Sequence, residues 1–146
     1  MAGAVRLNGW TRLLWRLHRN VYGRLGGRVG TLVGSFPVLL LTTTGRKTGL
    51  PRTVTLNFID LDEGVAVIGS YAGEPRDPSW ALNVRANPTV TVRIGRDVIA
   101  AVGREVFGRE RDRIAGTFED RDRSYTRYRE RTRRALPVFV FEATES

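Results

Sequence analysis

The segment "PVLLLTTTGRKTGLPRTVTLNFIDL" (residues 37–61) predicts two β-strands joined by a polar turn. The first strand is an apolar run that ends in three threonines and Gly45. The second strand alternates, with Val54, Leu56 and Phe58 on one face and polar residues between them. Alternation with a period of two is typical of a strand that has one buried face. The segment therefore indicates an antiparallel hairpin and a mainly β fold.

The rest of the chain repeats this pattern and adds short helices. Strands are expected at 65–71, 89–95, 98–107 and 136–143, tight turns at 62–64 and 95–97, and helices at 77–88, 108–120 and 122–135. In the first of these helices we expect Asp77 as the N-cap, Pro78 as the first helical residue and Pro88 beyond the end. About six antiparallel strands with flanking helices predict a mainly β (α+β) domain, a small antiparallel barrel with a helical cap.

The N-terminal segment at 8–25 predicts a helix with one apolar and one basic face. The apolar face has Trp10, Leu13, Leu14, Leu17 and Val21, and the basic face has Arg12, Arg16 and Arg19. Two alternatives stay open, because such a helix suits either an anionic membrane surface or packing on its own domain. The predicted organisation is a basic amphipathic helix in residues 1–30 and a barrel in residues 31–146, together forming one structural domain.

Positive charge is concentrated towards the N-terminus. Residues 1–59 carry nine of the 24 Lys and Arg and none of the 15 Asp and Glu, so they account for the whole net charge of +9. This excess predicts an anionic partner there, such as a phosphorylated ligand, a lipid surface or a nucleic acid. Nucleic acid is the least favoured of the three, because Trp10, Trp15 and Tyr22 lie in the helical segment and not on strands.

The residue types that are missing limit the chemistry. The chain has no cysteine, which excludes thiolate metal ligands and cysteine nucleophiles. Its single histidine, His18, argues against a histidine-based metal centre or a catalytic triad. We therefore expect no metal site, and we expect a borrowed cofactor to supply any demanding chemistry.

Three polar clusters are candidates for a site. In the turn at 42–52, Arg46, Arg52 and the only lysine, Lys47, accompany glycines and threonines. Turn amides with neighbouring cations can bind an anion, although a solvated surface turn has the same composition. At 70–80, Ser70 and Tyr71 precede Trp80 in the first turn of a helix, where the tryptophan either lines a pocket or anchors the core.

The third cluster is a pair of tyrosines, Tyr125 and Tyr128, at helical i, i+3 spacing. Neighbours at this spacing share one helix face. The pair either covers the barrel or orients a carbonyl or nitro oxygen and shares a proton with it.

The stretches "LLLTTTGRKTGLPR", "GSYAGEPRDPSWALNVRANPTV" and "SYTRY" with "RRALPVFVFE" together resemble the deazaflavin-dependent nitroreductase family of actinobacteria, also described as coenzyme F(420)-dependent quinone reductases. The similarity runs from about residue 37 to residue 142. It implies a split β-barrel related to flavin reductases and an oxidoreductase that uses the reduced deazaflavin. The hydride would pass to a quinone, nitroaromatic or enone acceptor. The alternatives are a deazaflavin-binding or carrier protein with little catalysis, or a reductase that uses FMN.

The resemblance also implies roles for individual residues. For the cofactor it implies Arg46, Lys47, Thr48 and Arg52 at the phosphate and oligoglutamate tail, and Thr53, Val54, Thr55, Leu56 and Asn57 beneath the cofactor. Around the deazaflavin it implies Ile68, Gly69, Ser70, Tyr71, Ser79, Trp80, Ala81, Leu82, Asn83 and Tyr125. For catalysis it implies Tyr125, Tyr128 and Ser70 on the substrate side.

Two positions depart from the nitroreductase pattern. Position 71 is Tyr where nitroreductase members commonly have Lys, and Asp122 replaces an aromatic residue three positions before Tyr125. The residues expected at the cofactor tail thus match the family better than the residues expected on the substrate side do. A lipid-soluble quinone acceptor would fit a cytoplasmic protein held at the inner face of the cell membrane by its basic N-terminal helix. Related split barrels also imply a homodimer.

Overall fold

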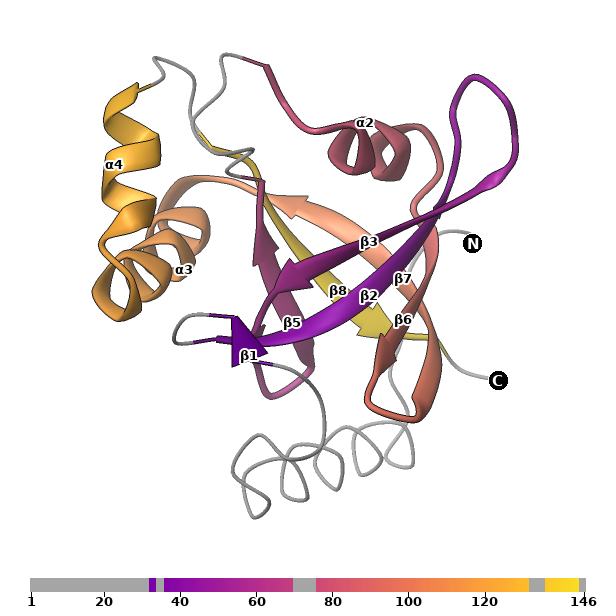
Figure 1. Cartoon of the computed structure of the whole chain (residues 1–146), viewed down its shortest axis with the longest axis horizontal. Helices are drawn as coiled ribbons and strands as arrows, with labels where there is room; N and C mark the ends of the chain where they lie inside the picture. The colour runs from indigo at the N-terminus through magenta and orange to yellow at the C-terminus, as the bar shows by residue number, and fades with distance from the viewer. Residues whose placement is uncertain (1–31, 34–35, 70–75, 132–135, 145–146) are drawn as a thin grey trace.

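The computed structural model describes residues 32–33, 36–69, 76–131 and 136–144 (Figure 1). The strands are β1 (Leu32–Val33), β2 (Phe36–Thr44), β3 (Pro51–Asn57), β4 (Ile59–Asp60), β5 (Gly64–Ile68), β6 (Thr89–Ile94), β7 (Asp97–Val106) and β8 (Val138–Ala143). The helices are α2 (Ser79–Ala86), α3 (Gly108–Arg121) and α4 (Ser124–Arg131). The helix predicted at 8–25, and with it the unit at 1–30, lies outside the described residues.

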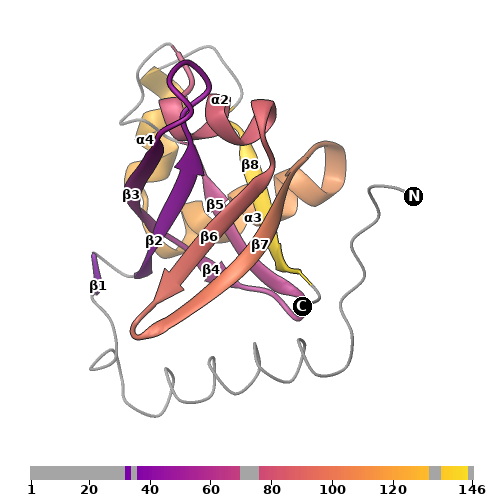
Figure 2. The same cartoon turned by 90° about the vertical axis from the view of Figure 1, so that its right-hand side faces the viewer.

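The strands form one curled antiparallel sheet. Its order is β1-β2-β6-β7-β8-β5-β4, and β3 pairs with β2 off this path. Figures 1 and 2 show the sheet rolled into a barrel, with α3 and α4 together at one side and α2 above the open end. The predicted split antiparallel barrel with flanking helices is confirmed. The two strands beyond the expected six are β1 and β4, each of two residues.

The strand predicted at 51–61 is interrupted at Phe58. β3 ends at Asn57, the N–H of Phe58 still donates to the carbonyl of Pro37 in β2 at 3.1 Å, and Ile59 then pairs with Ala66 of β5. Phe58 and Ile59 are both buried, at 2% and 4% exposure, although consecutive strand residues point to opposite faces. Each belongs to a different hydrophobic cluster. Such alternation between two cores also occurs within the unbroken β5, so the strand is interrupted because its pairing partner changes from β2 to β5.

The two hydrophobic cores lie on opposite faces of the sheet. The first, inside the barrel, includes Leu39, Leu41, Val65, Val67, Trp80, Val84, Val92, Phe139 and Phe141. The second, against α3 and α4, includes Phe36, Ala66, Ile68, Ile114, Phe118, Tyr125 and Val138. Every residue of β5 is buried because Val65 and Val67 face one core while Ala66 and Ile68 face the other. This double burial explains why the segment is a continuous apolar run without alternation.

Two predicted element ends are wrong. The residue that precedes the first turn of α2 is Pro78, with φ −66° and ψ 154° and no side-chain cap. Asp77 is not the N-cap, because its carboxylate instead accepts a hydrogen bond from Arg85 at 2.8 Å. The strand predicted at 65–71 ends at Ile68, and the N–H of Gly69 donates to the carbonyl of Pro137 at 2.8 Å.

Candidate functional site

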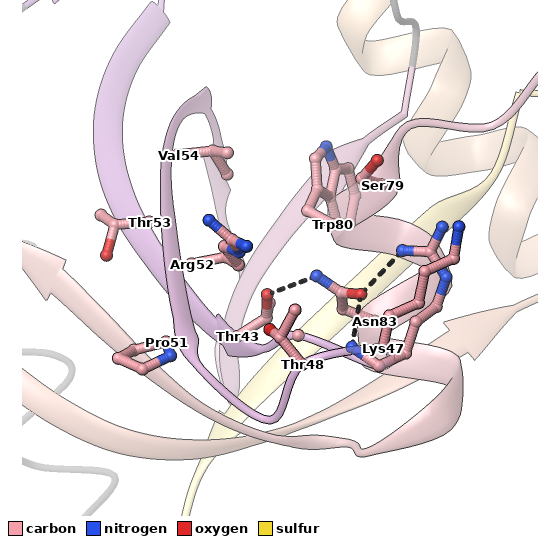
Figure 3. Close-up of a pocket in the computed structure, with 12 residues that line it drawn as sticks. Thr43, Lys47, Thr48, Pro51, Arg52, Thr53, Val54, Ser79, Trp80 and Asn83 are labelled. Atoms are coloured by element: carbon pink, nitrogen blue, oxygen red, sulfur yellow. Dashed lines mark hydrogen bonds between the residues drawn. The ribbon is translucent and has the colours of Figure 1, made fainter.

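A cavity of about 600 Å³ lies between α2 and the hairpin formed by β2 and β3 (Figure 3). It is lined by Thr43, Gly45, Arg46, Lys47, Thr48, Pro51, Arg52, Thr53, Val54, Ser79, Trp80 and Asn83. The lining comes from two separate parts of the sequence, residues 43–54 and 79–83. The turn of the first candidate cluster and Trp80 of the second therefore meet in one place.

The turn between β2 and β3 is closed by its own hydrogen bonds. The N–H of Gly45 donates to the carbonyl of Leu50 at 2.8 Å, and that of Gly49 donates to the carbonyl of Gly45 at 2.7 Å. Gly49 has a φ of +73°, a conformation that favours glycine. A Cβ on Gly45 would meet Oγ1 of Thr48 at 2.8 Å, so this position is restricted to glycine as well. The turn is held in one shape while the side chains of Arg46 and Lys47 remain exposed.

Asn83 of α2 connects the helix to this turn. Its Oδ1 accepts hydrogen bonds from the backbone N–H of Arg46 at 3.1 Å and from Nη1 of Arg46 at 2.9 Å. Its Nδ2 donates to Oγ1 of Thr43 at 3.1 Å. Asn83 and Thr43 are the two buried polar residues of the described chain, at 3% and 2% exposure. The dashed lines in Figure 3 mark these contacts.

Three cations surround the cavity. Arg52 is the cross-strand partner of Thr43, so both side chains lie on the same face of the hairpin. Arg46, Lys47 and Arg52 line the cavity, and its lining includes no carboxylate among the described residues. Within that part of the chain, none of the three forms an ion pair. The arrangement favours an anion, because guanidinium and ammonium groups give charge-assisted hydrogen bonds to phosphate and carboxylate.

The wall of the cavity also has apolar side chains. Trp80 lies on α2 at 6% exposure, and its ring packs edge-on against Phe139 with centroids 5.4 Å apart. Val54 of β3 lies on the hairpin side of the same cavity (Figure 3). Trp80 is therefore both a core residue and a pocket wall, so the two alternatives for it hold together. A wall that combines cations with an aromatic ring suits a planar ligand that carries an anionic tail.

α2 is also fixed from its other side. Arg85 donates to Glu105 of β7 and to Asp77, each at 2.8 Å, and lies over the Phe139 ring at 5.8 Å. The hydrogen bond to Glu105 is the largest contribution that raises the pKa of Arg85 above its ordinary value. The position of Trp80 thus depends on contacts with both the hairpin and β7.

The tyrosine cluster lies apart from this cavity. Tyr125 is 5% exposed, and its ring packs edge-on against Phe36 and Phe118 at centroid distances of 5.6 and 5.2 Å. Its hydroxyl accepts a hydrogen bond from Nδ2 of Asn57 at 2.9 Å, which joins α4 to the end of β3. Tyr125 and Ile68 also line a second cavity of about 320 Å³, with Arg111, Asp112, Ala115, Glu119 and Leu136.

Asp122, the other departure from the nitroreductase pattern, has a local role. Its Oδ1 accepts hydrogen bonds from the backbone N–H of Ser124 at 2.9 Å and from the Ser124 hydroxyl at 2.7 Å. The first of these is the largest contribution that lowers the pKa of Asp122 below its ordinary value. An ionised carboxylate therefore precedes the first turn of α4, where the helix dipole favours negative charge.

The candidate residues divide into three groups. Nine line the larger cavity, namely Arg46, Lys47, Thr48, Arg52, Thr53, Val54, Ser79, Trp80 and Asn83. Eight lie outside it, namely Thr55, Leu56, Asn57, Ile68, Gly69, Ala81, Leu82 and Tyr125. Ser70, Tyr71 and the side chain of Tyr128 lie outside the described residues. The cavity also has Thr43, Gly45 and Pro51 in its wall, which the candidate set missed although all three belong to the same quoted turn.

Two kinds of feature are absent from the described part of the chain. No group of three or more His, Cys, Asp and Glu side chains in residues 32–33, 36–69, 76–131 and 136–144 lies together as a metal ion would require. No helix in those ranges is long and apolar enough to cross a membrane.

In the comparison with known proteins, a family model and individual relatives carry the same description. Residues 14–143 match the model of the F(420)H(2)-dependent quinone reductase family. An F(420)H(2)-dependent quinone reductase of Mycobacterium tuberculosis is 35% identical over 133 residues, covering 87% of this chain and 88% of the relative. A putative enzyme of the same name from Mycobacterium bovis has the same identity and coverage.

Solved structures agree with this. A structure described as a domain-swapped dimer is 34% identical with a TM-score of 0.67, covering 87% of this chain and 98% of the other. An F(420)-H(2)-dependent reductase is 38% identical, also with a TM-score of 0.67, and covers 77% of this chain and 100% of its own. A haem storage protein of Vibrio cholerae, 17% identical with a TM-score of 0.60, shares the fold alone.

Proposed function

The chain belongs to the F(420)H(2)-dependent quinone reductase family, and we propose that it transfers a hydride from reduced coenzyme F(420) to a quinone. The observation that carries the proposal is the larger cavity, whose wall combines three cations, Arg46, Lys47 and Arg52, with the apolar side chains of Trp80 and Val54. A tricyclic deazaflavin ring with a phosphate and glutamate tail has the matching distribution of apolar surface and charge. The volume of about 600 Å³ lies within the usual range for a cofactor site.

When bound, the reduced deazaflavin supplies the hydride. The protein's part is to bind, orient and exclude water. Arg46, Lys47 and Arg52 would hold the anionic tail, and Trp80 would support the ring edge. This division of labour suits a chain without cysteine, in which the cofactor provides the reactive atom.

The proton that completes quinone reduction is assigned to the tyrosine cluster. Tyr125 is tied through Asn57 to the end of β3, the strand proposed to run beneath the cofactor. A phenol held there could donate to the quinone oxygen as the hydride arrives. Tyr128 and Ser70, whose side chains lie outside the described residues, are the other proposed donors.

The proposal is tested by the double variant Arg46→Ala/Lys47→Ala. We expect its dissociation constant for the cofactor to rise at least about 100-fold, because two charge-assisted contacts are lost. The matched control is Arg96→Ala/Arg109→Ala, which removes two exposed cations that line neither cavity. Equal weakening in both double variants would mean that total charge, and not the turn, binds the cofactor.

Two competing functions are separated by binding and turnover. Titration of the wild type with coenzyme F(420) and with FMN side by side should show preference for the deazaflavin; preference for FMN would reject the proposal. Oxidation of the reduced cofactor by menadione should then exceed the rate without protein. Tight binding without such turnover would favour a carrier protein.

We also propose that two copies associate through the outer face of the sheet formed by β3, β2, β6 and β7. Cross-strand pairs place on this face Leu40, Thr42, Thr44, Pro51, Thr53, Thr55, Thr89, Thr91, Arg93, Val98, Ala100 and Val102. Arg93 is the one charged residue in this set, and at its edge Arg104, two positions beyond Val102 on β7, is paired with Glu110 and Glu142. The domain-swapped dimer found for a 34% identical structure supports the association of two copies.

The dimer is tested by light scattering after size-exclusion chromatography. Ala100→Arg places a charge in the middle of the proposed face and should yield monomers. Phe107→Arg is the control, because Phe107 is 71% exposed and lies at the start of α3, away from that face. A wild type that elutes as a monomer, or a dimer that survives Ala100→Arg, would contradict this interface.

The basic N-terminal segment is proposed to attach the protein to the cytoplasmic face of the membrane, where quinones are dissolved. Six arginines and no acidic residue in residues 1–30 support this. Co-sedimentation with vesicles that contain anionic lipid should exceed that with neutral vesicles and should decrease with salt. Equal sedimentation with both kinds of vesicle would reject it.

A further inference from the structure

Asn83 is a buried amide whose oxygen is fully engaged by the protein. Both acceptor positions of Oδ1 are taken by Arg46, through its backbone N–H at 3.1 Å and its Nη1 at 2.9 Å. Nδ2 donates to the buried Thr43 hydroxyl at 3.1 Å. These contacts cross 37 to 40 positions of sequence and join α2 to the turn. Asn83 is thus built into the wall of the cavity.

The group that Asn83 holds is a cation at the mouth of the cavity. Arg46 is exposed, and in the described part of the chain its guanidinium makes only this hydrogen bond. A guanidinium has five N–H donors, so four remain for an anion. Fixing a long side chain before the ligand arrives reduces the conformational entropy lost on binding. The bond from Asn83 therefore orients Arg46 while leaving most of its donors available.

Two arginines that connect elements of the described chain, Arg85 and Arg104, are held differently. Arg85 donates to the carboxylates of Glu105 and Asp77, and Arg104 donates to those of Glu110 and Glu142. Each of these guanidinium charges is matched by acidic partners. Arg46 is oriented by a neutral amide, which accepts the same kind of hydrogen bond without cancelling the positive charge.

We propose that Asn83 is a positioning residue that orients Arg46 for the anionic tail of the cofactor, and that it must be an amide because a carboxylate would neutralise the charge that binds the tail. This inference rests on the proposed function. It changes the role expected for Asn83 from contact with the deazaflavin to action through Arg46. In this proposal α2 has two functions: Asn83 orients Arg46, and Trp80, one turn earlier on the same helix, forms the wall for the ring.

The test compares two ligands in three proteins: wild type, Asn83→Asp and Asn83→Ala. The ligands are coenzyme F(420) and a 5-deazaflavin analogue without phosphate and glutamates. Asn83→Asp can still accept both bonds from Arg46, so the fold should be kept. Its dissociation constant for the tailed cofactor should nevertheless rise at least about tenfold, while that for the tailless analogue stays within about twofold.

Asn83→Ala releases Arg46 and should also weaken binding of the tailed cofactor more than binding of the tailless analogue. In turnover assays both variants should raise KM for the cofactor with kcat little changed, since the tail does not react. A merely structural role would instead lower Tm and weaken both ligands alike. Thermal unfolding of each variant provides that readout.

The outcomes distinguish this inference from the proposed function. A wild type that binds the tailed and tailless ligands equally would refute the tail groove itself. A wild type that prefers the tailed cofactor, with the same preference in folded Asn83→Asp or Asn83→Ala, would overturn the role of Asn83 and leave the proposed function standing.

Discussion

Removing the hydroxyl of Tyr125 should uncouple α4 from the end of β3. Tyr125→Phe keeps the ring that packs against Phe36 and Phe118 and deletes the acceptor of the 2.9 Å hydrogen bond from Asn57. A partly buried donor left without its acceptor costs about 1–2 kcal/mol. For a chain of this length the corresponding decrease in Tm is about 3–8 °C.

A double-mutant cycle isolates this contact. Urea unfolding of Tyr125→Phe, Asn57→Ala and the double variant should give a coupling free energy of about 1 kcal/mol, because either single change already breaks the bond. When two substituted residues are not in contact, their changes in unfolding free energy add within about 0.3–0.5 kcal/mol. Coupling inside that limit would show that the two side chains do not support each other in solution.

The same variants separate positioning from proton transfer. If the Tyr125 hydroxyl donates the proton to the quinone, Tyr125→Phe should lower kcat about 100-fold or more, and Asn57→Ala, which keeps the phenol, should lower it much less. Equal losses in both variants would refute proton donation and assign Tyr125 a purely structural role at the end of β3.

Two further predictions concern packing and pH. Gly103→Ala should lower the free energy of unfolding by about 1–3 kcal/mol, because the new Cβ would lie 2.7 Å from the Phe141 ring. Gly116→Ala in α3, where a new Cβ would have no atom within 4 Å, should leave the free energy of unfolding unchanged or raise it. Urea unfolding of both variants measures the difference. The lowered pKa of Asp122 means that its carboxylate stabilises the folded state above the ordinary pKa of about 3.9 and loses this effect as pH falls through the folded-state pKa. Unfolding measured from pH 7 to pH 3 should therefore show a larger loss for wild type than for Asp122→Asn, and parallel pH profiles would contradict the assignment.

The strands were predictable where only one face is buried, because apolar and polar residues then alternate along the sequence. In β3, Val54 and Leu56 pack against the barrel core and alternate with the exposed Thr53 and Thr55, which is the pattern from which the second strand was predicted. The break after Asn57 was not predictable in this way, since Phe58 and Ile59 are both apolar in a continuous strand-like run. Their separation into two cores depends on the position of β5, which the local pattern does not contain.

The sequence predicted which charged residues gather at the turn, but not the side-chain contacts that hold them. The turn motif placed Arg46, Lys47 and Arg52 together because a short hairpin turn leaves its flanking residues opposite each other. The contact between Asn83 and Arg46 spans 37 positions, and no local rule indicates it. The sequence likewise could not show that the Tyr125 hydroxyl meets Asn57, because that bond depends on how α4 docks onto the sheet.

The cavity explains part of the uneven charge of the chain, because three of the nine cations in residues 1–59 line it. All three cations of the cavity come from the stretch that precedes the first acidic residue, Asp60. Elsewhere in the described chain, arginines such as Arg85 and Arg104 are paired with carboxylates and hold elements together. A cation that must receive an anionic ligand has to remain without such a partner, and the turn achieves this by using backbone bonds and the amide of Asn83 in place of carboxylates. The lack of carboxylates among the residues that line this cavity therefore fits the proposed binding of an anionic tail.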